Sequence, residues 1–289
     1  MSPPADTIAF QGLPGAYSDL ACRGVFPAMA TLPCPAFEDA FQAVRDGEAR
    51  LAMIPIENSV AGRVSDVHHL LPDSGLHIVG EHFEHVHHHL LAVPGATVAD
   101  LKTVRSHVMA LGQVRNLIRD LGVRPETAAD TAGAARDVAA LGDRSVGAIA
   151  SSLAGEIYGL VSLRGNVEDA AHNTTRFLIL SREGAVPKPG GGECVTTLVF
   201  EVRSRPAALY KALGGFATNG VNLTKLESYM LRGGFEATRF HADAEGHIED
   251  RGMQYALEEL RFFSKELKIL GVYPAHPYRR DSAALAAAD

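Results

Sequence analysis

The sequence predicts a two-lobed α/β domain followed by a smaller α+β domain of the ferredoxin-like class. First, an alternation of strands and helices occurs twice, on either side of about Val86, as expected for two small α/β lobes with a cleft between them. Second, a Pro- and Gly-rich linker without apolar runs covers residues 183–193. Third, the pattern after this linker is strand–helix–strand–strand–helix–strand, the order of a ferredoxin-like domain.

The two lobes are expected to share residues 7–182. The first lobe should comprise residues 7–83 together with 166–182, and the second lobe residues 84–165. Short apolar runs predict buried strands, and apolar residues at a helical period predict helices that cover them. The predicted strands lie at 7–10, 51–56, 104–107, 146–150 and 177–180, and the predicted helices at 37–46, 108–121, 131–141 and 151–158, with one more beginning near Asp19.

The smaller domain is expected at residues 194–273, ahead of an alanine-rich tail. Pro206 stands at a predicted helix start, and Gly233-Gly234 predicts a hairpin turn between two strands. The predicted strands are 196–201, 222–231, 235–243 and 267–271, and the predicted helices begin near 206 and span 248–266.

Composition and charge exclude some classes of protein. The formal net charge of −7 disfavours a nucleic-acid or anionic-membrane partner. No apolar run approaches the roughly 20 residues of a membrane span, and residues 1–6 lack the pattern of a signal peptide. Cys22, Cys34 and Cys194 show no metal-type spacing, so free thiols in a reducing cytoplasm are expected.

Polar residues gather where predicted strands end, which is where open α/β folds place ligand chemistry. Glu57-Asn58-Ser59 follows the strand at 51–56, and Ser106 stands where a cap of the helix at 108–121 belongs. Gln113 lies two helical turns further on. His172-Asn173-Thr174-Thr175-Arg176-Phe177 leads into the strand at 177–180. We expect these groups to converge on the cleft, although each also fits an ordinary turn or cap.

Two further stretches allow a functional and a structural interpretation. The glycine-rich turn at 11–18 precedes a helix, so its backbone N–H groups could hold a carboxylate, or it could be a plain connecting turn. The segment 82–89 holds five histidines, which raises the possibility of zinc. No cysteine or second motif completes a ligand set, so a polar strand face is the preferred interpretation and no metal is expected.

In their order along the chain, these motifs resemble the prephenate dehydratase family. The motifs are the turn at 12–18, Glu57-Asn58-Ser59, Ser106-His107 with Gln113, and Thr175-Arg176-Phe177. The resemblance implies a periplasmic-binding-protein-like catalytic domain and conversion of prephenate to phenylpyruvate in phenylalanine biosynthesis, without a cofactor. It implies Thr175 as the catalytic hydroxyl. The implied substrate-binding residues are Glu57, Asn58, Ser59, Ser106, Gln113, Thr174, Arg176 and Phe177. Arg176 could pair with a substrate carboxylate or with Glu57.

The same resemblance identifies residues 194–273 as an ACT domain, an amino-acid sensor that would bind phenylalanine in a homodimer or homotetramer. The implied effector-binding residues are Ala207, Ala208, Leu209, Tyr210, Asn222, Leu223, Glu227 and Ser228. Ala207 replaces the family's usual glycine, and Tyr229-Met230 replaces an Arg-Pro pair. Val108-Met109 likewise replaces a Pro-Gln pair beside the expected site.

Two other functions fit the pattern. Arogenate dehydratase acts on a substrate that carries an amino group in place of the keto oxygen, and nothing in the sequence separates the two activities. The two-lobed pattern also resembles solute-binding proteins, so a non-catalytic amino-acid or keto-acid sensor is the alternative from another class. Such a sensor would not require the Thr175-Arg176-Phe177 triplet.

Overall fold

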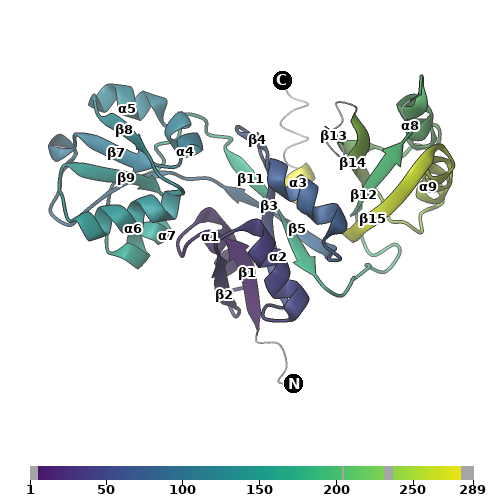
Figure 1. Ribbon diagram of the computed structural model, residues 1–289, viewed down its shortest axis with the longest axis horizontal. Helices are drawn as coiled ribbons and strands as arrows, with labels where there is room; N and C mark the ends of the chain where they lie inside the picture. The colour runs from purple at the N-terminus through teal and green to yellow at the C-terminus, as the bar shows by residue number, and fades with distance from the viewer. Residues whose placement is uncertain (1–5, 204, 231–236, 281–289) are drawn as a thin grey trace. The chain divides into compact units, whose positions relative to one another are not determined.

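The computed structural model describes residues 6–203, 205–230 and 237–280, and the chain divides into two compact units. The first unit holds residues up to 67 and 82–177, and the second holds 68–81 and everything from 178 onward. Strands β5 (His77–His85) and β11 (Thr174–Ser181) run along the chain from one unit into the other. Figure 1 draws the elements in chain order, and each unit is described separately below.

The first lobe of unit one is built on parallel strands. β1 pairs with β2 and with β3, and the strand order is β2-β1-β3-β11. The buried faces of β1 and β3 include Ile8, Phe10 and Met53, all fully buried. The elements of this lobe are β1 (Thr7–Gln11), α1 (Tyr17–Val25), β2 (Ala30–Cys34), α2 (Phe37–Asp46), β3 (Leu51–Asn58) and β4 (Gly62–Arg63), with β11 returning to it. Helix α3 (Ser65–Leu70) begins in this unit and continues along the chain into unit two at His68.

The second lobe of unit one is a five-stranded sheet in the order β10-β6-β9-β7-β8, flanked by helices (Figure 1). β9 is buried at every residue because the helices cover both of its faces. The elements are β6 (His89–Ala92), β7 (Thr103–Ser106), α4 (Val108–Gly112), α5 (Arg115–Leu121), β8 (Arg124–Thr127), α6 (Thr131–Leu141), β9 (Val146–Ala150), α7 (Ser152–Tyr158) and β10 (Val161–Arg164), with a short 3-10 turn at Val98–Asp100. Another 3-10 turn, Leu71–Asp73, belongs to unit two.

One expectation about local structure was wrong. The single helix predicted at 108–121 is broken into α4 and α5, because Gln113 ends the first helix and the Asp169 carboxylate accepts from Arg115 N at the start of the second. The polar strand preferred for residues 82–89 is present in part, since β5 runs to His85 and β6 begins at His89.

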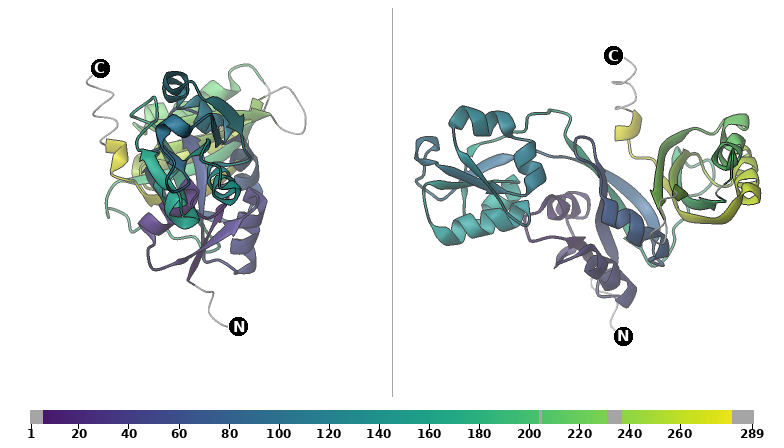
Figure 2. Two further views of the ribbon diagram at one scale, coloured as in Figure 1. Left: turned by 90° about the vertical axis from the view of Figure 1, so that its left-hand side faces the viewer. Right: turned by 45° about the horizontal axis from the view of Figure 1, so that its top comes forward.

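Unit two contains the predicted ferredoxin-like arrangement. Its antiparallel strands follow the order β13-β14-β12-β15, and α8 and α9 pack together on one face, as the right-hand view of Figure 2 shows. The Gly233-Gly234 turn lies outside the described residues. The elements are β12 (Cys194–Val202), α8 (Ala208–Thr218), β13 (Leu223–Met230), β14 (Ala237–Glu245), α9 (Arg251–Phe263) and β15 (Ser264–Pro274).

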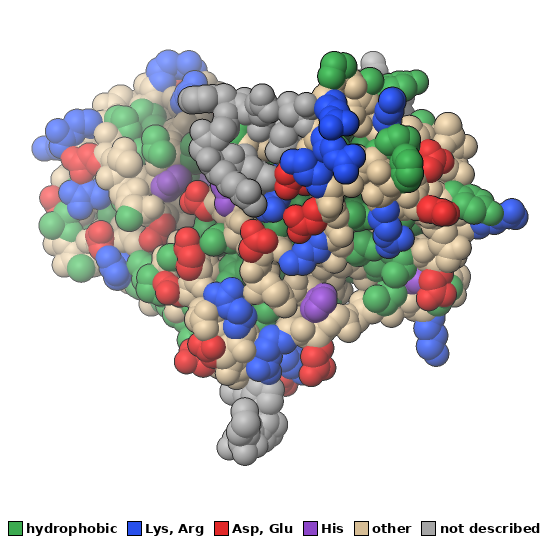
Figure 3. All heavy atoms as spheres, turned by 45° about the vertical axis from the view of Figure 1, so that its right-hand side comes forward, with side chains coloured by type: hydrophobic (Ala, Val, Ile, Leu, Met, Phe, Trp, Pro, Cys, Tyr) green, Lys and Arg blue, Asp and Glu red, His purple; other side chains and the backbone are tan. Residues whose placement is uncertain are grey.

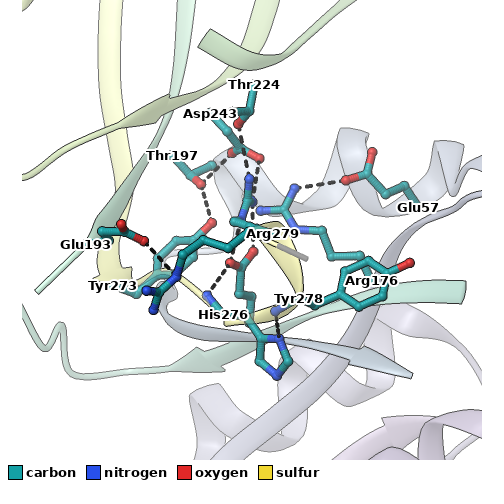
Figure 4. Close-up of polar contacts among 12 residues, drawn as sticks. Glu57, Arg176, Glu193, Thr197, Thr224, Asp243, Tyr273, His276, Tyr278 and Arg279 are labelled. Atoms are coloured by element: carbon teal, nitrogen blue, oxygen red, sulfur yellow. Dashed lines mark hydrogen bonds and ion pairs between the residues drawn. The ribbon is translucent and has the colours of Figure 1, made fainter. Parts of the chain in front are cut away.

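A buried ionic cluster ties the end of unit two to its strands (Figure 4). The Arg279 guanidinium donates to both oxygens of Glu81 at 2.6 and 2.8 Å, and lies 3.6 Å from the Asp243 carboxylate. Thr197 donates to Asp243 at 2.6 Å and shares a hydrogen bond with the Tyr273 hydroxyl. Both carboxylates are fully buried, and the positive charge of the Arg279 guanidinium offsets the free-energy cost of removing them from water.

The surface is mixed in charge. On the face drawn in Figure 3, acidic and basic side chains are interspersed rather than segregated, in keeping with the net charge of −7. Within the described residues, no helix has the length and apolar character needed to cross a membrane.

Candidate active site

Asn58 is the residue that joins the end of β3 to the start of β11. Its carbonyl oxygen accepts from the backbone N–H groups of Val60 and Ala61 at 2.9 and 2.7 Å, which fixes the orientation of the amide. The amide nitrogen must therefore donate, and it reaches Thr175 Oγ1 at 3.0 Å and Asn173 Oδ1 at 2.8 Å. Asn58 thus sets the direction of the hydrogen bond to Thr175.

Thr175 has its hydroxyl proton available for a ligand. Since Oγ1 accepts from Asn58, the single O–H of Thr175 can point toward another acceptor. The side chain is half-buried, whereas its neighbours Thr174 and Arg176 are each 4% exposed and lie on the opposite face of the strand. Phe177 is also buried and packs in the core.

Arg176 is paired within the protein. Its guanidinium donates to Glu57 Oε1 at 2.9 Å, and its carbon Cζ lies 6.0 Å from the centre of the Phe83 ring (Figure 4 shows the ion pair). Of the two roles expected for Arg176, the geometry supports the pairing with Glu57. The substrate-binding role expected for both residues has no such support from their position.

Ser59 and Thr174 fasten the loop before β11. Ser59 Oγ donates to the His172 carbonyl at 2.7 Å and accepts from Thr174 N at 3.0 Å. Thr174 Oγ1 lies 3.2 Å from His85 Nδ1. Both hydroxyls therefore shape the backbone that presents Thr175.

Gln113 belongs to the same network, through a contact that crosses 60 residues of chain. Asn173 Nδ2 donates to Gln113 Oε1 at 3.1 Å, and His88 Nε2 approaches the same oxygen at 2.8 Å. On its other side, His88 Nδ1 lies 2.7 Å from the Tyr17 hydroxyl. A continuous chain of hydrogen bonds therefore runs from Thr175 to Tyr17.

Ser106 makes its hydrogen bond within the sheet of the second lobe. It ends β7, is fully buried and donates to the Ile149 carbonyl at 2.6 Å. The expected helix cap is supplied by His107, whose Nδ1 accepts from Met109 N. The prediction of Ser106 as a cap was therefore wrong, because its hydroxyl is used to hold β7 against β9.

The electrostatic surroundings favour neutral groups at the Tyr17 end. Burial raises the pKa of Tyr17 well above its usual value, so the phenol stays protonated. Burial lowers the pKa of His88 despite its hydrogen bond with Gln113 and the nearby Glu168. Burial alone would raise the pKa of Glu168, but hydrogen bonds from His87 and from backbone N–H groups outweigh it and lower that pKa.

The glycine-rich turn is occupied by the protein's own groups. The buried Asp19 carboxylate accepts from Gly15 N at 2.9 Å, in the place where a ligand carboxylate was considered. A Cβ atom at Gly15 (φ +88°) would lie 2.7 Å from the Cα of Ala154. Ser151 Oγ donates a hydrogen bond to the carbonyl of Gly15. The turn therefore joins the two lobes.

The histidines of 82–89 point to different partners. His82 contacts Glu84, His87 contacts Glu168 and His89 contacts Ser162, each at 2.9 Å. Among the described residues there is no group of three or more His, Cys, Asp or Glu side chains that could hold a metal ion.

The expected effector-binding residues lie around α8 and β13 in unit two. Ala207 caps α8 with φ +61°, the left-handed region that its usual glycine would occupy without strain. Tyr229 is 7% exposed and its ring contacts those of His68 and His69. The others are placed as follows: Ala208, Leu209 and Leu223 pack against the core, Tyr210 is exposed, Asn222 donates to Glu245, Glu227 faces Lys225, and Ser228 lies on β13.

Sequence reasoning missed His88 and Tyr17 as members of the site and named Asn173 only as part of the loop before β11. Each lies in a stretch that was singled out, namely the loop before β11, the histidines and the glycine-rich turn. Their partners lie 25 to 115 residues away along the chain, so local pattern alone did not connect them.

Comparisons with known proteins agree on one family. The family model for prephenate dehydratase matches residues 8–185. A bifunctional N-acyl-homoserine lactone acylase/prephenate dehydratase of Komagataeibacter europaeus is 57% identical over 94% of this chain and 97% of its own. Arogenate dehydratase/prephenate dehydratase 1 of Arabidopsis thaliana, a chloroplastic protein, is 42% identical over 92% of this chain and 71% of its own. The crystal structure of a prephenate dehydratase from Arthrobacter aurescens in complex with L-Phe superposes with a TM-score of 0.85 at 30% identity, covering 97% and 96% of the two chains.

Proposed function

Because this chain belongs to the prephenate dehydratase family of lyases, we propose that it converts prephenate to phenylpyruvate. The substrate loses CO2 and a ring hydroxyl. The electrons of the breaking C–C bond enter the ring, and the C–O bond breaks as the ring becomes aromatic. The departing hydroxide needs a proton, and the protein must supply a donor at that position.

The observation that carries this proposal is the hydrogen bond from Asn58 to Thr175 Oγ1. It leaves the Thr175 O–H as a hydrogen-bond donor to the departing oxygen, and solvent supplies the proton that converts the released hydroxide to water. A threonine hydroxyl is a weak acid, so its contribution is a hydrogen bond that strengthens as negative charge develops. Single donors of this kind contribute about 3 kcal/mol to transition-state stability.

Gln113 supplies a second donor in the proposed site. Its Oε1 is held by Asn173 and His88, so its NH2 group can reach a substrate oxygen. Asn58 acts by orienting Thr175, and Glu57 and Arg176 maintain the strand that carries it. No step in this scheme calls for a metal or a redox group.

Arogenate is the alternative substrate, and it is favoured by plant relatives that carry both activities in their descriptions. The experiment supplies purified protein with prephenate or arogenate in parallel and measures phenylpyruvate or phenylalanine. We expect turnover of prephenate. A protein that turns over neither substrate would contradict the proposed function, and one that uses arogenate alone would correct its substrate.

Hydrolysis of N-acyl-homoserine lactones is a second candidate activity. It is favoured by the relative that is 57% identical over nearly the whole chain and is described as having both activities. Release of free homoserine lactone from an acylated substrate would establish it. Thr175→Val would then show whether the two reactions use one hydroxyl.

For unit two, we infer an ACT domain that binds phenylalanine and pairs with a second copy of the chain. The ferredoxin-like strand order and the relative crystallised with L-Phe support this inference. Ala207 and the buried ring of Tyr229 alter two positions of the expected effector motifs. Calorimetry should detect phenylalanine binding, and light scattering a homodimer or homotetramer. A complete lack of binding at millimolar phenylalanine would end the regulatory proposal.

A further inference from the structure

The hydrogen-bond chain of the site has a direction that can be worked out donor by donor. Asn58 Nδ2 donates to Asn173 Oδ1, so the Asn173 amide presents its NH2 group to Gln113. Gln113 Oε1 accepts that bond and must also accept from His88, because the same oxygen lies 2.8 Å from His88 Nε2. His88 Nε2 therefore carries a proton.

The Tyr17 hydroxyl fixes the other side of the imidazole. With the proton of neutral His88 on Nε2, Nδ1 has a lone pair, and the Tyr17 O–H at 2.7 Å donates to it. The His87 carbonyl, 3.0 Å from the same hydroxyl, is a second acceptor. His88 is 1% exposed, so water does not compete for either nitrogen.

The opposite tautomer would be incompatible with the rest of the chain. A His88 with its proton on Nδ1 would need Gln113 to turn and donate its NH2 group to Nε2. The turned amide would then point its oxygen away from Asn173 Nδ2, leaving that buried donor without its acceptor. Asn173 cannot turn in response, because Asn58 is held by the backbone N–H groups of Val60 and Ala61. Leaving a buried donor unsatisfied is costly.

We propose that His88 is a positioning residue: its protonated Nε2, with Nδ1 facing the Tyr17 hydroxyl, fixes Gln113 so that the amide NH2 faces the substrate beside the Thr175 hydroxyl. The proposal rests on the function above and deepens it. The site then presents two oriented donors, the Gln113 NH2 group and the Thr175 hydroxyl. A substrate that fits them carries one oxygen acceptor opposite each donor. His88 does not itself transfer a proton to the substrate, since both of its nitrogens are engaged.

Two substitutions of His88 separate positioning from packing. In His88→Gln, the side-chain nitrogen can occupy the place of Nε2 and still donate to Gln113. In His88→Asn, the shorter amide can reach Tyr17 but not Gln113. We expect His88→Gln to keep kcat/KM for prephenate within about threefold of the wild type, and His88→Asn to lose about a hundredfold, on the scale of one lost oriented donor.

Tyr17→Phe tests the hydrogen bond at His88 Nδ1, and Tyr158→Phe is its matched control. Tyr158 also donates one hydrogen bond across the lobes, to the Pro14 carbonyl at 2.9 Å, but lies outside the chain of bonds. We expect about a fivefold loss of kcat/KM in Tyr17→Phe, equivalent to one ordinary hydrogen bond, and no loss in the control. Equal losses in the two variants would contradict the role of Tyr17.

The tautomer itself can be observed without any activity. A long-range 1H–15N NMR spectrum of wild-type protein should show His88 protonated at Nε2 and bare at Nδ1. The opposite tautomer would overturn the inference whether or not prephenate is turned over. If the wild type is active and His88→Gln and His88→Asn lose the same activity, the inference fails while the proposed function stands.

Discussion

Replacing Asn58 by aspartate reverses one hydrogen bond at the centre of the site. The carboxylate keeps an oxygen for the N–H groups of Val60 and Ala61, so the turn after β3 is retained. The second oxygen replaces the NH2 group that lies 3.0 Å from Thr175 Oγ1. Thr175 would then donate to the new carboxylate and lose the proton that the substrate needs.

The magnitude follows from the contacts that are lost. Removing one oriented donor from a developing oxyanion costs about 3 kcal/mol, or roughly a hundredfold in kcat. The new carboxylate oxygen would also replace the NH2 group that now donates to Asn173 Oδ1 at 2.8 Å, so two acceptor oxygens would face each other. This loss should destabilise the fold by about 1–3 kcal/mol. We therefore expect a large loss of rate together with a fall of several degrees in Tm.

The assay follows phenylpyruvate absorbance and thermal unfolding for Asn58→Asp, Thr175→Val and the double variant. If Asn58 acts through Thr175, the double variant should be about as slow as Thr175→Val alone, because the two substitutions remove one donor. Independent, multiplicative losses would refute this reasoning, as would an Asn58→Asp enzyme within threefold of the wild-type rate.

Three other outcomes are expected. Arg176→Met should lower stability by about 2 kcal/mol, seen as a lower Tm, because it removes the buried guanidinium that donates to Glu57; a raised KM with unchanged Tm would instead assign the guanidinium to the substrate. Ala207→Gly should raise stability by about 1 kcal/mol by relieving φ +61°, and an unchanged Tm would show that the backbone is not strained there. The pKa of His88 is lower in the folded protein than in the unfolded chain, so below about pH 6.5 the unfolded chain binds a proton that the folded protein does not. The free energy of unfolding should therefore decrease as the pH falls below about 6.5, with a slope of at most about 1.4 kcal/mol per pH unit. His88→Gln should flatten this part of a plot of Tm against pH, and an identical slope in the variant would assign the effect to another group.

Much of the fold was predictable because local pattern dictates it. The helix at 37–46 and the strand at 146–150 were predicted at their observed bounds, since an apolar face or a continuous apolar run leaves little choice. The break at Gln113 was not predictable from periodicity, because the apolar positions continue from α4 into α5. It is imposed by the contacts of Asp169, more than fifty residues away.

The site was predictable in its residue types more than in its connections. Asn58 and Thr175, expected at strand ends, and Gln113, expected on the helix after Ser106, are brought into one network. Ser106 was predicted beside them because a serine before a helix usually caps it, but here its hydroxyl donates to the Ile149 carbonyl. Which hydroxyl faces a ligand depends on the pairing of β7 with β9, and one short stretch of sequence does not reveal that pairing.

The central claim is that the Thr175 hydroxyl donates to the departing oxygen of the substrate. The most direct measurement compares kcat for prephenate in the wild type, Thr175→Ser and Thr175→Val, with folding checked by Tm. The serine keeps the donor and should remain within about tenfold of the wild type, while the isosteric valine should lose about a hundredfold or more. A valine variant that is folded and fully active would contradict the claim.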